Sequence, residues 1–383
     1  MSRRRAGPWT RRTGLVVLLT AVLFLVEGLA RLAEPALPTW QFATTESGGS
    51  IMTGHPTRLW ANGPGVRENG GTTATINQDG LRGPLPGPRP TERHRVLLLG
   101  DSTAFGHGVA DGESFIDGTG ELLQEEGLDV DVVNGAVAGY SIAQSRLLME
   151  EQGWGYDPTL LVISTLWSDN TWDSFRDEDL LASRALAQKN PLAHSAAVRL
   201  LATALGRLMP PKTGQIVTVS RLGEWPEGRV RRVPLQRYHE LLDELVRDAA
   251  DRGVGVLLLR LGNTQQLERS DEYMSWDPYF EAMGALAEHH QLPLVDVGPL
   301  FLASGLQEQE LYLDVMHPTT RGHKLIAKAL RDTLLAANWP TEPLLGRAEP
   351  LKAELQDMRP PLGFTELGEG SPQRLLFPEQ ESR

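Results

Sequence analysis

The sequence Arg95-Val-Leu-Leu-Leu-Gly-Asp-Ser-Thr-Ala-Phe-Gly-His-Gly108 decides which fold we expect for this chain. An apolar run leads into Gly100-Asp101-Ser102, and a turn with closely spaced glycines follows. Such a run, bounded by a turn, is typical of a buried strand. In open α/β sheets, the loops that carry chemistry lie at the carboxyl ends of the strands. The stretch therefore predicts a parallel sheet that presents Ser102 at this edge.

A second chemistry-bearing stretch, Leu313-Asp-Val-Met-His-Pro318, comes late in the chain. Asp314 and His317 stand just before a predicted helix, and proline suits the first turn of such a helix. A serine hydroxyl becomes a good nucleophile when a base takes its proton, and the base needs a partner that orients it. We therefore predict Ser102 as nucleophile, His317 as base and Asp314 as the orienting carboxylate.

Strand and helix patterns alternate from residue 95 onward. This order predicts an α/β fold in which a parallel sheet is covered by helices on both faces. Strands are expected at 96–99, 130–133, 160–165, 255–261 and 292–297, and helices at 114–126, 142–151, 235–252, 279–290 and 320–338.

Residues 171–232 interrupt the alternation as an insertion. They contain a very apolar helical stretch at about 191–209 and a hairpin pattern at about 215–230. We interpret the apolar stretch as a lid or cap packed on the core, with contact to a membrane as the alternative.

The N-terminus has the features of an export signal. The apolar run over residues 14–26 is preceded by five arginines, Arg3, Arg4, Arg5, Arg11 and Arg12. In such signals the positive end stays in the cytoplasm. A full span needs roughly 17–25 residues, and extending the run to Ala33 places Glu27 and Arg31 near the far interface. We expect an uncleaved membrane anchor, or a signal peptide cut after Ala30 or Ala33. Either places the rest of the chain outside the cytoplasm, periplasmic or at the cell surface, and cleavage would make it secreted.

Four parts of the chain are expected from these patterns. Residues 1–33 form the anchor or signal peptide, and residues 34–92 form a lead-in of short strands, one of them at 72–77. Residues 93–339 form the main domain, and residues 340–383 form a Pro-rich tail.

The composition excludes several classes of function. A formal net charge of −12 over 383 residues leaves no basic face for nucleic acid. The chain contains no cysteine, which excludes disulfides, thiolate metal sites and a cysteine nucleophile. No His, Asp and Glu cluster has metal-ligand spacing beyond Asp314 and His317, and no glycine loop has the phosphate-binding form. We therefore expect no metal and no cofactor.

Three blocks within residues 95–336 resemble the SGNH (GDSL-type) hydrolase family. They are Gly100-Asp101-Ser102, Asn134-Gly-Ala-Val-Ala-Gly139-Tyr140 and Asp314-Val-Met-His317-Pro318. The resemblance implies a flavodoxin-like three-layer sandwich around a central parallel sheet. It implies hydrolysis of esters, often acetyl groups on carbohydrates, or of lipids. It also implies an oxyanion hole that contains the backbone N–H groups of Ser102 and Gly139.

One block departs from the family pattern. The family has Gly-x-Asn-Asp after the third strand, and that Asn donates to the oxyanion, whereas this chain reads Leu166-Trp167-Ser168-Asp169-Asn170. Ser168 replaces the Asn by position. Three outcomes are open: Ser168 donates, Asn170 donates, or neither does. Trp167 beside this block and His107 near the nucleophile turn are candidates for substrate contact, with plain packing as the alternative for Trp167.

Together these features favour an exported, membrane-anchored serine esterase that acts on a small-molecule or glycan ester. One alternative is an O-acyltransferase, in which a hydroxyl of a surface polysaccharide replaces water. The other is a catalytically impaired carbohydrate-binding protein on the same fold. The change at Ser168 supports this last hypothesis, and the intact set of Ser102, Asp314 and His317 argues against it.

Overall fold

A computed structural model describes residues 8–33, 51–173, 175–189, 195–198, 200–201, 229–268, 274–352 and 355. The chain divides into two compact units. The smaller comprises Met1–Ala43 and Leu181–Thr213, and the larger comprises Thr44–Leu180 and Gly214–Arg383. Most of the predicted apolar helix at 191–209 and of the hairpin at 215–230 lies outside the described residues.

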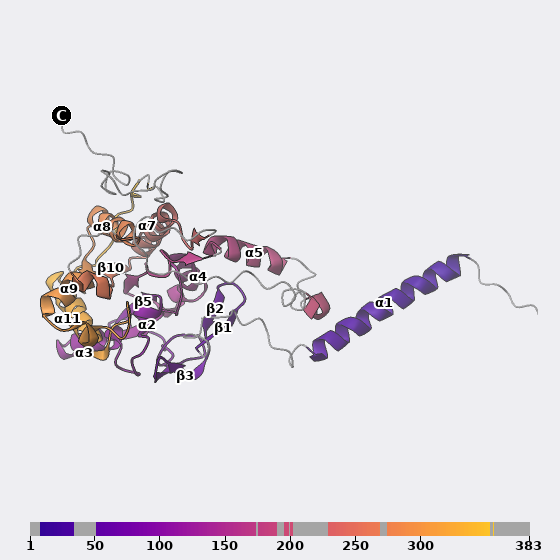
Figure 1. The fold of residues 1–383 in the computed structure, drawn as a ribbon, viewed down its shortest axis with the longest axis horizontal. Coiled ribbons are helices and arrows are strands. Elements are labelled where there is room, and N and C mark those ends of the chain that lie inside the picture. The colour runs from indigo at the N-terminus through magenta and orange to yellow at the C-terminus, as the bar shows by residue number, and fades with distance from the viewer. Residues whose placement is uncertain are drawn as a thin grey trace, which may run out of the picture. The chain divides into compact units, whose positions relative to one another are not determined.

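The larger unit is built on a five-stranded parallel sheet (Figure 1). Its strands, in spatial order, are β11 (Leu294–Asp296), β10 (Gly255–Arg260), β7 (Leu160–Ser164), β5 (His94–Gly100) and β6 (Val130–Asn134). Counted along the chain, this order is 2-1-3-4-5 read from β6, which is the flavodoxin-like doubly wound order. The predicted fold class is therefore confirmed.

β5 and β7, the first and third strands of this sheet along the chain, carry the site at their carboxyl ends. β5 pairs with β6 on one side and with β7 on the other, so that Gly100 lies opposite Ser164. The chain reverses its winding direction between β5 and β7, and ligands of doubly wound sheets bind at such a switch point. A side chain at Gly100 would overlap Ala104 and the Ser164 carbonyl group, so the close approach requires glycine here.

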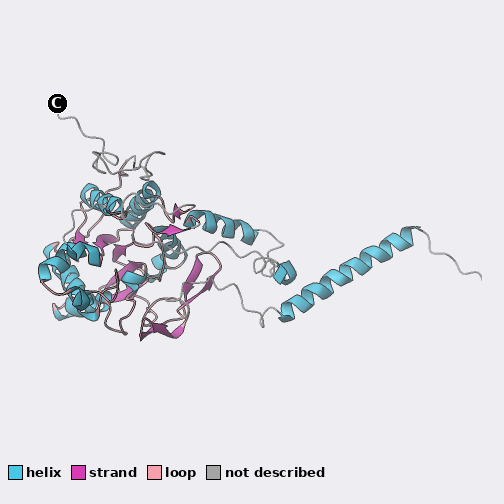
Figure 2. Cartoon of the chain, in the orientation of Figure 1, coloured by secondary structure: helices cyan, strands magenta, loops and turns pink. Residues whose placement is uncertain are grey.

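Helices cover both faces of the sheet (Figures 1 and 2). On one face α3 packs against α11, and α11 contacts α9. On the other face α7 packs against both α4 and α8. Strand residues such as Val96 and Leu98 are fully buried, because both faces are covered. The helices are α3 (Phe115–Glu125), α4 (Ile142–Glu151), α7 (Leu235–Asp251), α8 (Asp277–His290), α9 (Val297–Ser304) and α11 (Thr320–Ala336).

The described part of the lead-in, residues 51–92, contains two antiparallel hairpins, and the second includes the predicted strand. They are β1 (Met52–His55) with β2 (Leu59–Asn62), and β3 (Gly65–Asn69) with β4 (Thr72–Ile76). The first hairpin contacts the loop after β6: the Trp60 indole donates to the Ala138 carbonyl oxygen at 2.9 Å. The Tyr140 hydroxyl donates to the Trp60 carbonyl oxygen at 2.6 Å. The lead-in therefore packs on the second family block.

A short antiparallel pair of strands joins the beginning of the insertion to its end. β8 (Trp172–Asp173) pairs with β9 (Val230–Arg231), and the Arg231 guanidinium lies 4.2 Å from the centre of the Trp172 ring. The short elements that remain in the larger unit are α2 (Ser102–Phe105), η2 (Gly153–Tyr156), η4 (Thr264–Glu268) and α10 (Glu308–Leu311). Helix α5 (Asp177–Lys189) follows β8 along the insertion.

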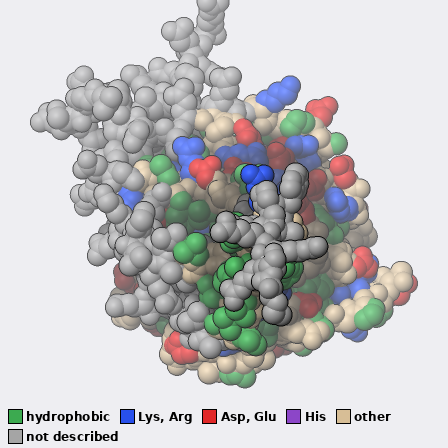
Figure 3. All heavy atoms as spheres, turned by 90° about the vertical axis from the view of Figure 1, so that its right-hand side faces the viewer, with side chains coloured by type: hydrophobic (Ala, Val, Ile, Leu, Met, Phe, Trp, Pro, Cys, Tyr) green, Lys and Arg blue, Asp and Glu red, His purple; other side chains and the backbone are tan. Residues whose placement is uncertain are grey.

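The smaller unit contains α1 (Pro8–Ala33). Its segment Arg12–Ala33 is long and apolar enough to cross a membrane, and a signal sequence near an N-terminus has the same properties. The leucines, valines and Phe24 of this segment are exposed. The space-filling view colours exposed hydrophobic side chains green (Figure 3).

Candidate active site

The structure brings Ser102, His317 and Asp314 into one hydrogen-bonded chain. Ser102 begins α2 one residue after β5 ends, and the other two lie on the loop before α11. His317 Nε2 is 2.9 Å from Ser102 Oγ, and His317 Nδ1 is 2.7 Å from Asp314 Oδ2. With Nδ1 protonated toward the carboxylate, Nε2 is free to accept the serine proton.

The Asp314 carboxylate is held by the loop on which it lies. Its Oδ1 accepts the backbone N–H groups of Met316 and His317, both at 2.9 Å. Burial alone raises the pKa of Asp314, but the His317 ring and these N–H groups outweigh burial and hold that pKa well below its usual range. The charged carboxylate therefore faces Nδ1 throughout the neutral range.

Asp101 fixes the nucleophile turn to the loop after β7. Its Oδ1 accepts from the Thr103 N–H at 3.0 Å and from the Thr103 hydroxyl at 2.6 Å. Its Oδ2 accepts from the Ser168 N–H at 3.0 Å and from the Ser168 hydroxyl at 3.2 Å. Asp101 is almost fully buried. It therefore supports the turn, and the single Ser168 hydroxyl proton is used in the same contact.

Two backbone N–H groups are free to bind an oxyanion. Within the described part of the chain, the N–H groups of Ser102 and Gly139 donate no hydrogen bond. Gly139 has φ = +76°, a conformation that glycine adopts without strain. A Cβ there would lie 3.4 Å from Trp60, so the loop and the lead-in are closely packed.

Asn170 does not fit the expected role of oxyanion donor. Its amide nitrogen donates to the carbonyl oxygens of Leu166 at 2.9 Å and Trp167 at 3.2 Å, and the residue is fully buried. An amide has only two N–H bonds, and both are used inside this loop. Of the three outcomes left open above, these contacts favour one in which Asn170 does not donate to the oxyanion.

The two candidates for substrate contact differ in their surroundings. Trp167 is 3% exposed and packs against Trp276 and Phe280, with ring centres 5.6 and 5.9 Å away. This burial and these ring contacts favour plain packing, the alternative given for Trp167. The half-buried His107 lies beside the base, with its ring centre 4.6 Å from that of His317. Burial, and then the charge of His317, lower the pKa of His107.

Arg232, which was not predicted from the sequence, holds the Gly139 loop through the Gly139 carbonyl group. Its guanidinium forms a bidentate ion pair with Asp177 at 2.9 and 2.7 Å. It also donates to the Gly139 carbonyl oxygen at 2.8 Å and to the Gln144 side chain at 3.2 Å. Residue 232 lies on the returning end of the insertion, so no local sequence signal links it to Gly139.

Asp169 is a buried carboxyl group in the same loop. One oxygen accepts the Ile142 N–H at 2.8 Å, and the other has no partner among the described residues. Burial raises the pKa of Asp169 to about 8. The group is therefore neutral between about pH 4 and pH 8, where an exposed aspartate is charged.

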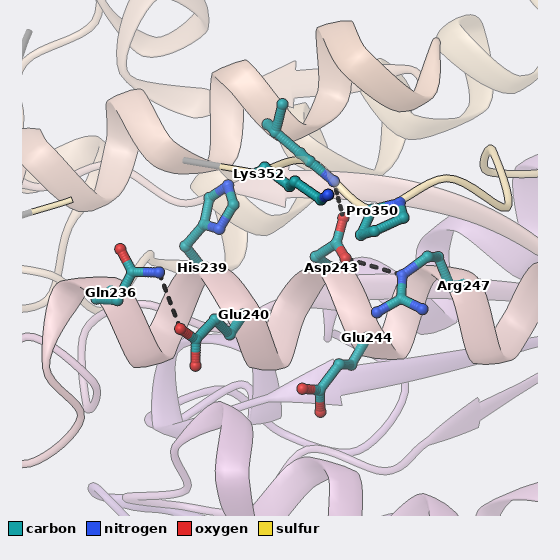
Figure 4. A pocket seen from close by; sticks show the side chains of 9 residues that line it. Gln236, His239, Glu240, Asp243, Glu244, Arg247, Pro350 and Lys352 are labelled. Carbon is teal, nitrogen blue, oxygen red and sulfur yellow. Dashed lines mark hydrogen bonds and ion pairs between the residues drawn. The ribbon is translucent and has the colours of Figure 1, made fainter. Parts of the chain in front are cut away.

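A pocket of about 470 Å³ lies elsewhere, along α7 (Figure 4). Side chains of α7 and residues Pro350, Leu351 and Lys352 line it, and Ser102, Asp314 and His317 do not. Within the described part of the chain, no group of three or more His, Asp or Glu residues is arranged to hold a metal ion.

Residues 98–325 match the model of the GDSL-like lipase/acylhydrolase family. No curated protein matches the chain. The solved structures that match the chain have low sequence identity to it and low TM-scores. The acetylxylan esterase Axe2 from Geobacillus stearothermophilus is 18% identical over 63% of this chain and 94% of its own, with a TM-score of 0.42. LAE5, an alpha/beta hydrolase from the metagenome of Lake Arreo, Spain, is 17% identical over 64% and 95%, with a TM-score of 0.41. A lipase/acylhydrolase from Enterococcus faecalis is 12% identical over 64% and 96%, with a TM-score of 0.42.

Proposed function

The chain belongs to the GDSL-like lipase/acylhydrolase family, and from this premise we propose that it hydrolyses esters through Ser102, His317 and Asp314. Membership of this family makes it an ester-hydrolysing enzyme. The observation that carries the assignment of the three residues is the continuous contact from Asp314 through His317 to Ser102, at 2.7 and 2.9 Å. This arrangement contains a nucleophile, a base and the group that orients the base.

In the first step the Ser102 hydroxyl attacks the ester carbonyl carbon while His317 Nε2 takes its proton. The negative charge that develops on the carbonyl oxygen is bound by the free N–H groups of Ser102 and Gly139. Collapse of the tetrahedral intermediate breaks the bond to the alcohol, which leaves with the proton that His317 returns. The acyl group is then bound to Ser102 Oγ.

In the second step His317 takes a proton from water, and the hydroxide attacks the acyl carbon. The same N–H groups bind the second oxyanion. The acid leaves, Ser102 regains its proton from His317, and the enzyme is restored. In the alternative O-acyltransferase, a carbohydrate hydroxyl takes the place of water in this step.

We propose that neither Ser168 nor Asn170 donates to the oxyanion, so that the hole consists of backbone groups alone. Asp101 accepts the Ser168 hydroxyl, and the Asn170 amide bonds its own loop. Loss of one donor in a serine protease lowers kcat by about 10²–10³-fold. A hole of this kind suits a slower enzyme with a reactive ester, such as an O-acetyl or other short acyl group on a carbohydrate, or a lipid ester.

We also propose that the enzyme is exported and remains anchored by α1. Arginines precede the apolar segment, and that segment has the length and composition of a membrane span. A signal peptide cleaved after Ala30 or Ala33 is the alternative.

Labelling with a fluorophosphonate tests the assignment of Ser102. We expect the purified full-length protein in detergent to be labelled and to hydrolyse p-nitrophenyl acetate. Ser102→Ala should abolish both, whereas the control Ser304→Ala, on α9, should retain both. Folded wild-type protein that is neither labelled nor active would favour the carbohydrate-binding alternative. Product analysis with an added oligosaccharide separates hydrolysis from acyl transfer.

A further inference from the structure

Glu27 is the one acidic residue in the candidate membrane span, and it has a full set of partners. The Arg31 side chain donates to it at 2.8 Å. The Ser195 hydroxyl donates at 2.7 Å, and the backbone N–H groups of Ala196 and Ala197 donate at 3.0 and 3.2 Å. A carboxylate within a span is costly unless it is paired. These contacts join α1 to the insertion inside the smaller unit.

The exposure of the α1 side chains indicates that the insertion contacts this helix at one place only along the described residues. Among its residues from 12 to 33, all are exposed except Glu27 and Ala30. These two are three positions apart and share one face of the helix. In the insertion, Ala196 is fully buried, whereas Val198 and Leu201 are 39% and 61% exposed. The segment therefore meets α1 through its first residues and leaves larger apolar side chains uncovered.

The position of Glu27 along the span sets the depth of this contact. With a rise of about 1.5 Å per residue, Glu27 lies roughly 9 Å before the end of the span at Ala33. Amphipathic helices that lie in a membrane interface bury their apolar face by about 5–10 Å. In sequence, residues 195–209 are mostly apolar, with Arg199 and Arg207 as their only charged residues.

We propose that the segment starting at Ser195 lies in the membrane interface on the non-cytoplasmic side of the bilayer that α1 spans. Its hydrogen bonds to Glu27 hold it against α1, and Val198 and Leu201 contact phospholipid. The inference rests on the proposed anchorage by α1. The chain leaves the larger unit after Leu180, twelve residues after Ser168, and re-enters it at Gly214. The enzyme is thus attached to the bilayer at a second point, through the segment that interrupts its catalytic fold.

Site-directed cysteines test the contact, because the chain has no cysteine of its own. In membranes, we expect Ala30→Cys combined with Ala197→Cys to be joined by a short bifunctional thiol reagent, because these changes leave Glu27 and Ser195 in place and Ala30 shares the face of Glu27. Leu25→Cys combined with Ala197→Cys is the matched control, since residue 25 lies on another face of α1, and it should remain unjoined. Equal reaction of both pairs, or of neither, would overturn the docking of this segment on Glu27.

Lipid contact is tested with full-length protein in phosphatidylcholine vesicles. A fluorophore on Leu201→Cys should be quenched by lipids with a nitroxide near the headgroup, and one on Glu125→Cys, exposed on α3, should not. Glu27→Leu should reduce the quenching at residue 201 at least twofold. Absence of quenching in protein that resists carbonate extraction would overturn the proposal and leave the anchorage intact. Extraction by carbonate would instead contradict the anchorage, and fluorophosphonate labelling reports separately on the catalytic fold.

Discussion

Ser168 stands where the family pattern has an oxyanion-donating asparagine, and its hydroxyl is used elsewhere. Asp101 accepts this hydroxyl at 3.2 Å and the Ser168 N–H at 3.0 Å. The backbone contact survives removal of the hydroxyl, so the loop should keep its place.

We therefore predict that Ser168→Ala changes the rate of acylation by less than about threefold, measured as the burst with p-nitrophenyl acetate. A lost donor would instead lower this rate by about 10²–10³-fold with little change in substrate binding. A loss of that size would establish Ser168 as a donor and contradict a hole made of backbone groups. Melting temperature serves as the control for folding.

Asp169 makes the stability of the fold depend on pH. Its pKa is about 8 in the folded protein because it is buried, whereas that of an unfolded aspartate is about 3.9. Between these values the folded state holds a proton that the unfolded state has lost. Stability from this group is therefore fully present below about pH 4 and decreases as pH rises toward 8.

Asp169→Asn should remove this dependence, since the amide oxygen can still accept the Ile142 N–H. We predict that the melting temperature of the variant, relative to wild type, rises steadily from pH 5 to pH 8 by differential scanning fluorimetry. A constant difference over this range would show that Asp169 is charged in the folded protein. The same scan on Asp129→Asn, an exposed carboxylate, provides the control.

The residues that perform the proposed chemistry were largely identifiable from sequence, and their supports were not. Ser102, Asp314 and His317 each sit within a short local pattern that fixes their place at the sheet edge. The uses of Asn170 and Trp167 depend on how the loop after β7 folds back on itself and on α8. Arg232 and Trp60 reach Gly139 from distant parts of the chain. Such contacts leave no periodic or local signal.

At the scale of elements, Arg232 links the returning end of the insertion to the Gly139 loop. Its partner Asp177 begins α5 and is fully buried, and the Arg232 side chain is 8% exposed. Removal of one member of a buried ion pair leaves the other charged and without a partner, which costs about 3–5 kcal/mol.

We predict that Arg232→Met lowers the free energy of unfolding in urea by about 3 kcal/mol or more. It should also lower kcat, because the Gly139 carbonyl group loses its donor. The matched control is Arg93→Met, which breaks the exposed pair with Asp129, where the side chains are 41% and 57% exposed. That change should cost at most about 1 kcal/mol. Equal losses in the two variants would show that the buried pair has no special role.

The main elements follow from hydrophobic patterning, because a doubly wound sheet needs buried strands and one-sided helices. The predicted helix at 142–151 has the bounds of α4, and the strand at 160–165 differs from β7 by one residue. The pair of β8 and β9 was not predicted. Its partners are 57 or more residues apart, and two-residue strands have no detectable period.

At the scale of the whole molecule, the N-terminal end is basic, whereas the rest of the chain is acidic. Five arginines precede the apolar run at residues 14–26, while the whole chain has a net charge of −12. Positive residues before a span are retained in the cytoplasm, and the acidic remainder does not oppose translocation, because acidic residues contribute little to orientation.

We therefore predict that a reporter fused after Arg383, of a kind that is active only outside the cytoplasm, is active in cells. Replacement of the five arginines by glutamate should reduce this activity strongly, since the signal that orients the span is lost. A cytoplasm-only reporter at the same site should be inactive in the wild type. If that second reporter is fully active, the larger unit lies in the cytoplasm, and both the export and the outer-leaflet contact of the insertion are wrong, whereas the esterase assignment to Ser102 is unaffected.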